Sequence, residues 1–201
     1  SYGCKATSVA GAVQLSGADS IIYKSTFTDC TNFADGGAIR LTRNCIIYDC
    51  TFTNCAADPL DGSNKGYGGA VYFVASDSML YNCTFINCTT DFGCLSVYSP
   101  KDDPTKLCTR ARMSVSNSYF EGNYARTEPG CINNCGIVTV TNSTFYRNSA
   151  FWWAGAIHTH GGANTTVYGC NFTDNVAGWN GGALYTYSYL QIYNTIFIGN
   201  N

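Results

Sequence analysis

One unit recurs seven times along the 201-residue chain, and this repetition restricts the possible folds more than any other feature. Its clearest copy, GGALYTYSYLQIYNTIFIGN at 181–200, joins a glycine-rich corner to two short apolar strands separated by an Asn. The second strand carries a Phe, which recurs as Phe27, Phe52, Phe85, Phe120, Phe145, Phe172 and Phe197. These Phe residues are 25, 33, 35, 25, 27 and 25 positions apart. A repeated unit of about 20–50 residues is typical of a solenoid, in which each copy forms one coil.

Aligned on their Phe, the copies share columns of constant chemistry. Five residues before the Phe, every copy has an aliphatic side chain: Ile22, Ile47, Leu80, Val115, Val140, Val167 and Ile192. Three residues before the Phe, the copies have Asx, Gly or Lys: Lys24, Asp49, Asn82, Asn117, Asn142, Gly169 and Asn194. The aliphatic column predicts a core, and the Asx and Gly column predicts a bend with left-handed backbone. The glycine-rich corner, clearest at Gly36–Ile39, Gly68–Val71 and Gly181–Leu184, predicts another tight turn.

The column three residues after the Phe changes its chemistry along the chain. It holds Cys30, Cys55 and Cys88 in the first three copies, then Asn123, Asn148, Asn175 and Asn200. Stacked Asn side chains can bond the backbone of the next coil, so we predict an asparagine ladder. Equivalent Cα atoms of neighbouring coils lie about 4.8 Å apart, within the roughly 4.4–6.8 Å that a disulfide tolerates. We therefore predict disulfides between coils at Cys30–Cys55, Cys50–Cys83 and Cys94–Cys131, with Cys88 as a competing partner for Cys55.

The repeat predicts strands that stack on one another. No segment has a sustained 3.6-residue period, so crossover helices between the strands are not expected. Stacking like residues requires parallel strands in register. We predict an all-β fold, a right-handed parallel β-helix of about seven coils stapled by disulfides. No Pro- or Ser-rich linker separates the copies, so 1–201 is expected to be a single domain. Two longer insertions, 56–67 and 99–110, are expected to be surface loops.

The repeat resembles that of a known family. Phe-x-x-Asn paired with Gly-Gly-Ala-Ile, -Leu or -Val is similar to the repeats of the chlamydial polymorphic outer membrane proteins and of related surface proteins in other microbes and protists. It stands here as Phe172–Asn175 with Gly181–Leu184, as Phe145–Asn148 with Gly155–Ile157, and as Phe197–Asn200. The resemblance covers nearly the whole chain. It implies a right-handed β-helix on an exported protein with an adhesive or structural role.

Charge and cysteine content restrict the partners and the compartment. Charged residues make up 12% of the chain and the net charge is −2, so nucleic acid is not expected as a partner. No run of about 18 apolar residues is present, so no membrane span is expected. Twelve cysteines favour an oxidising compartment. Asn-x-Ser/Thr sequons predict N-linked glycans at Asn82, Asn87, Asn142, Asn164 and Asn171. We expect a secreted or cell-surface protein.

Two groups of side chains are candidate binding residues. Aromatic residues precede the glycine-rich corner at Tyr67, Phe92, Trp153 and Trp179, with Trp152 beside them. On an exposed corner this aromatic row would bind a sugar or a neighbouring subunit, whereas under a folded loop it would be structural. His158 and His160 share one face of a strand and could hold a metal ion. No third ligand lies near them in sequence, so we expect an ordinary surface pair, with no metal and no cofactor.

Enzymatic, structural and adhesive roles make different demands on this fold. β-Helix lyases and hydrolases need carboxylates that converge on one face. Asp29 and Asp174 share a column but are expected to lie five coils, or about 24 Å, apart, so we assign no catalytic residue and expect no enzyme.

Neither end shows an evident cap, which favours a structural glycoprotein. We expect a subunit or segment of an extracellular filament or surface appendage, associating head to tail with itself or with neighbouring β-helix segments. The alternatives are a surface adhesin for a host or neighbour-cell ligand and a polysaccharide-active enzyme.

Overall fold

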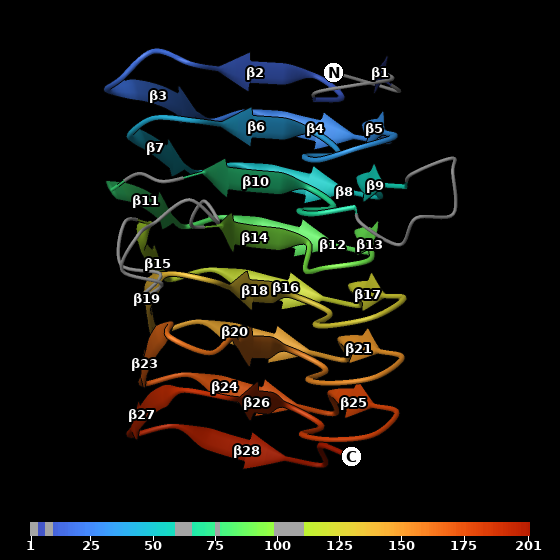
Figure 1. The fold of residues 1–201 in the computed structure, drawn as a ribbon, viewed down its shortest axis with the longest axis vertical. Helices are drawn as coiled ribbons and strands as arrows, with labels where there is room; N and C mark the ends of the chain where they lie inside the picture. The colour runs from blue at the N-terminus through green and yellow to red at the C-terminus, as the bar shows by residue number, and fades with distance from the viewer. Residues whose placement is uncertain (1–3, 7–9, 59–65, 75–76, 99–110) are drawn as a thin grey trace.

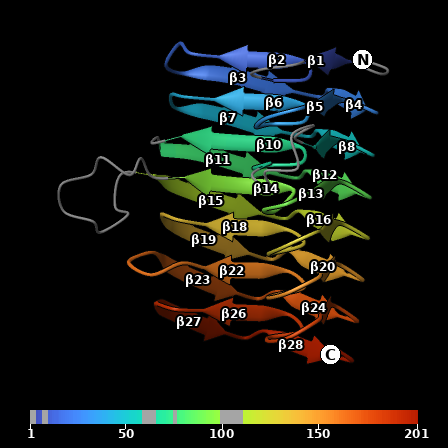
Figure 2. The same cartoon turned by 45° about the vertical axis from the view of Figure 1, so that its right-hand side comes forward.

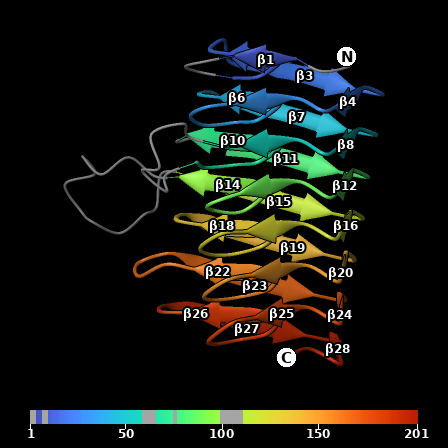
Figure 3. The same ribbon diagram turned by 90° about the vertical axis from the view of Figure 1, so that its right-hand side faces the viewer.

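The chain winds into stacked coils, each built from four short strands (Figure 1). A computed structural model describes residues 4–6, 10–58, 66–74, 77–98 and 111–201. Their strands form four parallel sheets of seven strands each. We call these sheets I to IV, in the order in which the chain visits them. Coil 1 contains β1–β4 and coil 7 contains β25–β28, so the coil number rises from the N-terminus to the C-terminus (Figures 2 and 3).

Each sheet takes one strand from every coil. Sheet I contains β1 (Lys5–Ala6), β5 (Thr31–Asn32), β9 (Ala56–Ala57), β13 (Thr89–Thr90), β17 (Tyr124–Ala125), β21 (Ser149–Ala150) and β25 (Val176–Ala177). Sheet II contains β2 (Val13–Leu15), β6 (Ile39–Leu41), β10 (Val71–Val74), β14 (Leu95–Tyr98), β18 (Ile132–Asn134), β22 (Ile157–Thr159) and β26 (Leu184–Thr186). Sheet III contains β3 (Ser20–Tyr23), β7 (Cys45–Tyr48), β11 (Asp77–Tyr81), β15 (Arg112–Ser116), β19 (Ile137–Thr141), β23 (Asn164–Tyr168) and β27 (Tyr189–Tyr193). Sheet IV contains β4 (Thr26–Thr28), β8 (Thr51–Thr53), β12 (Thr84–Ile86), β16 (Tyr119–Glu121), β20 (Thr144–Tyr146), β24 (Asn171–Thr173) and β28 (Ile196–Ile198).

The predicted Phe column is the spine of sheet IV. Every Phe pairs in register with the Phe of the next coil, as Phe85 does with Phe120. The rings stack with centroids 4.6–5.0 Å apart and nearly parallel planes. The predicted aliphatic column lies on the inner face of sheet III and is fully buried from Ile47 to Val167. Together with the inward side chains of sheet II, these columns form one continuous core.

Two of the corners follow the sequence prediction. All seven residues three positions before the Phe have positive φ, from 46° at Lys24 to 64° at Gly169. In the glycine-rich corner, the two positions require glycine for different reasons. Gly36 has φ of 70°, whereas a Cβ on Gly37 would lie 1.9 Å from the backbone oxygen of Gly69 in the next coil. The first glycine therefore permits the turn, and the second permits the close approach of two coils.

A third left-handed corner was not predicted. It lies two residues after the Phe, at Asp29, Asn54, Asn87, Gly122, Arg147, Asp174 and Gly199, all with positive φ. Six of these seven residues are Asx or Gly, the types that tolerate this conformation, so the signal was present in the sequence.

The insertions change the spacing of the repeat without changing its register. Phe52 and Phe85 are 33 residues apart and still pair. The predicted loop 56–67 begins later than expected, because Ala56–Ala57 is β9. Residues 59–65 of that insertion, and 99–110 of the other, lie outside the described residues. In the described part of the chain, no helix has the length and apolar character needed to cross a membrane.

Removing one ring from the Phe column should destabilise the whole rod. Phe120 is fully buried between Phe85 and Phe145, so Phe120→Ala leaves a cavity that flanking backbone cannot fill. We expect a loss of about 3–5 kcal/mol in the free energy of unfolding. Urea denaturation followed by circular dichroism measures it. Phe151→Ala, which removes a ring that is 58% exposed, is the control and should change stability little. Equal losses in the two variants would contradict the role given to the column.

Candidate functional site

Coil 7, the last coil of the described chain, exposes side chains of the kind that inner coils bury. Phe172 and Val167 in coil 6 are fully buried, whereas Phe197 and Ile192 in coil 7 are 44% and 42% exposed. A hollow of about 470 Å³ lies among Gly181–Leu184, Leu190, Phe197 and Asn200. Strands β26, β27 and β28 are the last strands of their sheets and pair on one side only within the described chain, whereas β25 also pairs with Asn201, whose carbonyl accepts the Ala177 N–H (2.8 Å). The edge therefore offers unpaired backbone groups around an apolar centre.

This edge also lacks charge. None of residues 176–201, which include all of coil 7, is Asp, Glu, Lys, Arg or His. Natural proteins usually protect exposed strand edges with charged residues, Pro or bulges. The β28 strand instead reads Ile196-Phe197-Ile198, with all three side chains exposed. Nothing electrostatic opposes the approach of another coil to this edge.

The predicted asparagine ladder runs from coil 4 to this edge. The Asn123 Nδ2 donates to Asn148 Oδ1 (2.9 Å), Asn148 donates to Asn175 (3.0 Å), and Asn175 donates to Asn200 (2.9 Å). Each Oδ1 also accepts the backbone N–H of the residue one coil earlier, starting with Cys88. These hydrogen bonds satisfy the buried side-chain amides along the stacking direction. The same pair of hydrogen bonds joins each coil of the ladder to the next.

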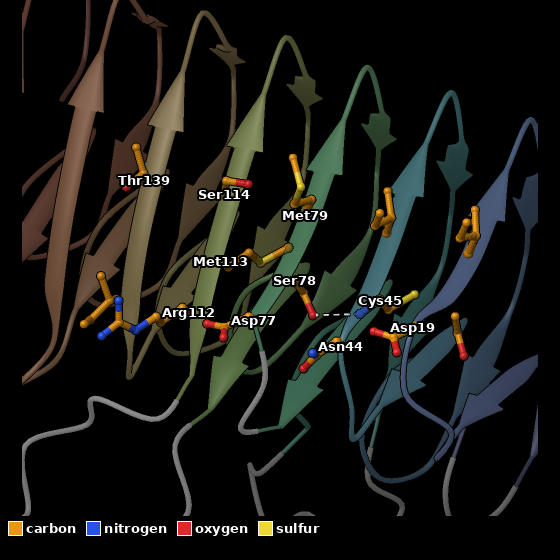
Figure 4. Close-up of a pocket in the computed structure, with 14 residues that line it drawn as sticks. Asp19, Asn44, Cys45, Asp77, Ser78, Met79, Arg112, Met113, Ser114 and Thr139 are labelled. Atoms are coloured by element: carbon orange, nitrogen blue, oxygen red, sulfur yellow. Dashed lines mark hydrogen bonds between the residues drawn. The ribbon is translucent and has the colours of Figure 1, made fainter.

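A second hollow, of about 600 Å³, lies on the outer face of sheet III (Figure 4). Ile21, Ile46 and Met79 from coils 1–3 stand in register along it and are exposed. Asp77 and Arg112 pair in register at its border. Beneath the surface, the Cys45 N–H donates to Ser78 Oγ (3.3 Å). Sequence reasoning missed this groove, although its apolar column stands six residues before the Phe in the first three copies.

The predicted aromatic row is two separate clusters. Tyr67 and Phe92 stack in adjacent coils with ring centroids 4.7 Å apart and are half-buried. The ring centroids of Trp152, in coil 6, and Trp179, in coil 7, lie 4.5 Å apart. Coil 5 interrupts the row, because Pro129 stands at this corner, where its carbonyl accepts the Gly93 N–H.

Within the second cluster, the two neighbouring tryptophans have different surroundings. Trp153 lies against the rings of His158 and Tyr187, with centroids 6.1 and 5.9 Å away. The exposed rings of the cluster are therefore Trp179, at 64% exposure, and Phe151, at 58%, with the half-buried Trp152 between them.

The prediction that His158 and His160 form an ordinary surface pair is wrong. His158 is fully buried on the outer face of β22, among the rings of Trp153, Tyr185 and Tyr187. The carboxylate of Glu128, from the β17–β18 connection of coil 5, lies 2.9 Å from His158 Nδ1. Burial, with the neighbouring His158, lowers the pKa of His160 to about 4, so this imidazole is neutral at pH 7.

A second polar cluster lies on the same side of coil 5. Arg126 Nε contacts Asp91 Oδ1 at 2.7 Å, and its Nη1 contacts Asp58 Oδ1 at 2.7 Å. The Asp91 side chain is fully buried, and its other oxygen accepts the Gly66 N–H (2.9 Å). The hydrogen bonds that Arg126 donates to Asp91 and Asp58, opposed by burial, raise the pKa of its guanidinium. These groups connect the start of the first insertion to the coils that follow it.

The cysteine pairs lie in the predicted columns. Cys30 with Cys55, Cys50 with Cys83, and Cys94 with Cys131 each precede strand residues that pair across neighbouring coils. A hydrogen bond from the Cys83 thiol lowers the pKa of the Cys50 thiol to about 7. Cys55 contacts both Cys88 and Cys30, so the competition foreseen for Cys55 is present. Cys50, Cys55, Cys83, Cys94 and Cys131 are thiols in this structure, and the three disulfides stay predictions.

The predicted glycosylation sites are accessible. The asparagine side chain is exposed in each sequon, at Asn82, Asn87, Asn142, Asn164 and Asn171. Asn82, Asn87 and Asn142 occupy left-handed corners between the strands. Attachment of a glycan requires such access.

Four parallel sheets around a single stacked core define the class of the protein: an all-β solenoid of the parallel β-helix type. A family model described as "Right handed beta helix region" matches residues 2–127, more than half of the chain, and the chain belongs to this family. The coils are therefore right-handed, as predicted. No curated protein and no solved structure matches the chain.

The cysteine columns predict a specific peptide map. If the protein matures in an oxidising compartment, a non-reducing digest should contain linked peptides for Cys50–Cys83, Cys94–Cys131 and Cys30–Cys55. The double variant Cys94→Ala/Cys131→Ala should lose about 2–4 kcal/mol of stability relative to the oxidised protein. The same digest after reduction is the control. A map without any of the three links would show that the columns hold thiols.

Proposed function

We propose that the protein is a non-enzymatic extracellular structural glycoprotein, a segment of a filament or surface appendage that assembles by end-to-end stacking of β-helices. The uncharged edge of coil 7 supports this most. It combines exposed residues of the core columns, Phe197 and Ile192, with three strands, β26–β28, whose outer edges are unpaired in the described chain, and with no charged residue in 176–201. Covering this edge with another coil would bury the apolar centre and pair the backbone groups.

Coil 1 of a second copy carries the residue types on which this edge would stack. Phe27, Ile22 and Val13 occupy the same columns in coil 1 as Phe197, Ile192 and Leu184 do in coil 7. A second copy stacked in register would extend the Phe column and the aliphatic column across the junction. Such a contact joins two different surfaces of the same protein, so it does not close and produces a fibre.

The remaining features agree with an exported structural role. Twelve cysteines favour an oxidising compartment, and all five sequons are exposed. Asp29 and Asp174, which share a column, belong to coils 1 and 6 and cannot act on one bond.

Electron microscopy of the purified protein tests the stacking. We expect filaments with an axial repeat of about 34 Å, since seven coils rise about 4.8 Å each. Phe197→Asp places an unpaired charge in the junction and should abolish filaments while circular dichroism still reports the β-helix. Ile198→Asp changes the outward neighbour on the same strand and should leave stacking in place. Monomers of the unmodified chain at every concentration, or filaments formed by Phe197→Asp, would refute the proposal.

The exposed tryptophan cluster favours a second candidate function, a surface adhesin. Trp179 and Phe151 are 64% and 58% exposed, and Trp152 stands between them with its ring centroid 4.5 Å from that of Trp179. Exposed aromatic rings of this kind provide faces for a sugar or a protein ligand.

Replacing the cluster separates the two functions. In Trp152→Ala/Trp179→Ala we expect at least a tenfold loss of binding to any glycan or cell surface that the unmodified protein binds, with filament formation unchanged. Glycan arrays and cell-binding assays measure this. Tyr23→Ala, which removes an aromatic side chain that is 55% exposed on coil 1, serves as the control. Unchanged binding in the double variant would exclude the cluster as the ligand site.

A further inference from the structure

Three metal-ligating side chains meet on the outer face of sheet II. His158 lies on β22, His160 follows that strand, and Glu128 comes from the preceding coil. One ligand atom from each residue lies within 4.8 Å of the other two. Sequence reasoning found no third ligand because Glu128 is 30 positions before His158, and stacking of the coils brings them together.

The atoms in this cluster have unmet bonding capacity. Within the described residues, both ring nitrogens of His158 and the Oε2 of Glu128 lack a hydrogen-bond partner. His158 Nδ1 and Glu128 Oε2 are 2.9 Å apart, yet they do not have hydrogen-bond geometry. Buried polar atoms are nearly always satisfied in native proteins, so orphaned donors and acceptors that converge on one point indicate a missing partner.

His160 is held as a metal-ligating imidazole is commonly held. Asn133 donates its Nδ2 to Ser96 Oγ (3.0 Å), which orients its Oδ1 towards His160 Nε2 at 2.7 Å. An amide oxygen only accepts hydrogen bonds, so Nε2 carries the proton and Nδ1 keeps its lone pair. A histidine that donates one ring N–H to a carbonyl oxygen and presents the other nitrogen is the usual outer-shell arrangement of a metal site.

A simple ion pair accounts for less of this geometry. A protonated His158 beside Glu128 would leave the second ring nitrogen of His158 without a partner. It would also give no reason for a second imidazole whose ring centroid is 4.2 Å from that of His158. Two nitrogens and one carboxylate oxygen are instead a common ligand set for zinc, with a fourth position for water.

We infer that Glu128, His158 and His160 bind a divalent transition-metal ion of the zinc type, which links coil 5 to coil 6. The nitrogen and oxygen ligands select zinc and its neighbours over magnesium or calcium, which prefer sites made of oxygen alone. The rings of Trp153, Tyr185 and Tyr187 surround His158 and shield the ion on one side. The metal would thus cross-link coils 5 and 6, as the three predicted disulfides would cross-link coils 1 and 2, coils 2 and 3, and coils 4 and 5.

Zinc binding by the purified chain tests this inference. Equilibrium dialysis against Zn²⁺ and a competing chelator should reveal a site whose affinity falls at least tenfold in Glu128→Gln and in His160→Gln. Glu121→Gln, a glutamate change in the preceding coil, is the matched control and should bind like the unmodified protein. Zinc should also raise the melting temperature of the unmodified protein and of Glu121→Gln, but not that of the two ligand variants.

Two further measurements distinguish this site from zinc bound by cysteine and from a variant that fails to fold. Thiolate ligation of Co²⁺ produces an intense near-ultraviolet charge-transfer band, and a His₂Glu site does not. Anomalous diffraction from zinc-soaked crystals of the unmodified protein locates the ion without any substitution. An anomalous peak among the three side chains supports the site. Equal zinc affinity in all variants, or no peak there, would overturn it and leave a His158–Glu128 ion pair.

Discussion

The structure depends on the self-stacking of like side chains. In a parallel β-helix each inward residue lies directly above and below its counterparts in neighbouring coils, about 4.8 Å away. Only residue types that pack or hydrogen-bond with themselves at that distance can fill a column. Phe rings meet this condition face to face, aliphatic side chains meet it by close packing, and Asn meets it by passing hydrogen bonds from Asn123 to Asn200. The same residue types therefore recur at the same positions of each copy in the sequence.

This dependence determines which parts of the fold could be predicted. The Phe, aliphatic and Asn columns and two left-handed corners could be predicted, because each depends on a local property of its residue type. The same reasoning would have found the corner at Asp29, Asn54 and their equivalents, had the column two residues after the Phe been read for backbone conformation. The site was less readable. The contact between Glu128 and His158 depends on how the outer faces of coils 5 and 6 align. Neither residue belongs to a column of like residues from which the contact could be predicted.

The outer surface follows different rules from the core. An outward column changes identity freely, so the row expected from Tyr67 to Trp179 is broken at Pro129 and divides into two clusters. Burial there comes from contacts among neighbouring outward side chains, which is why His158, Asn133 and Ser96 are buried although they face away from the core. Chemistry that distinguishes one coil from another is therefore concentrated on the outside of sheet II and at the corners.

The constant register across coils of unequal length has an evolutionary consequence. Phe52 and Phe85 pair although the chain between them is eight residues longer than between Phe27 and Phe52, where the spacing is 25 rather than 33. Mutations that add or delete residues at such corners leave every core column intact. The solenoid can therefore diversify by insertion rather than by substitution. Selection can change the length and sequence of individual loops with little effect on the stability of the rod.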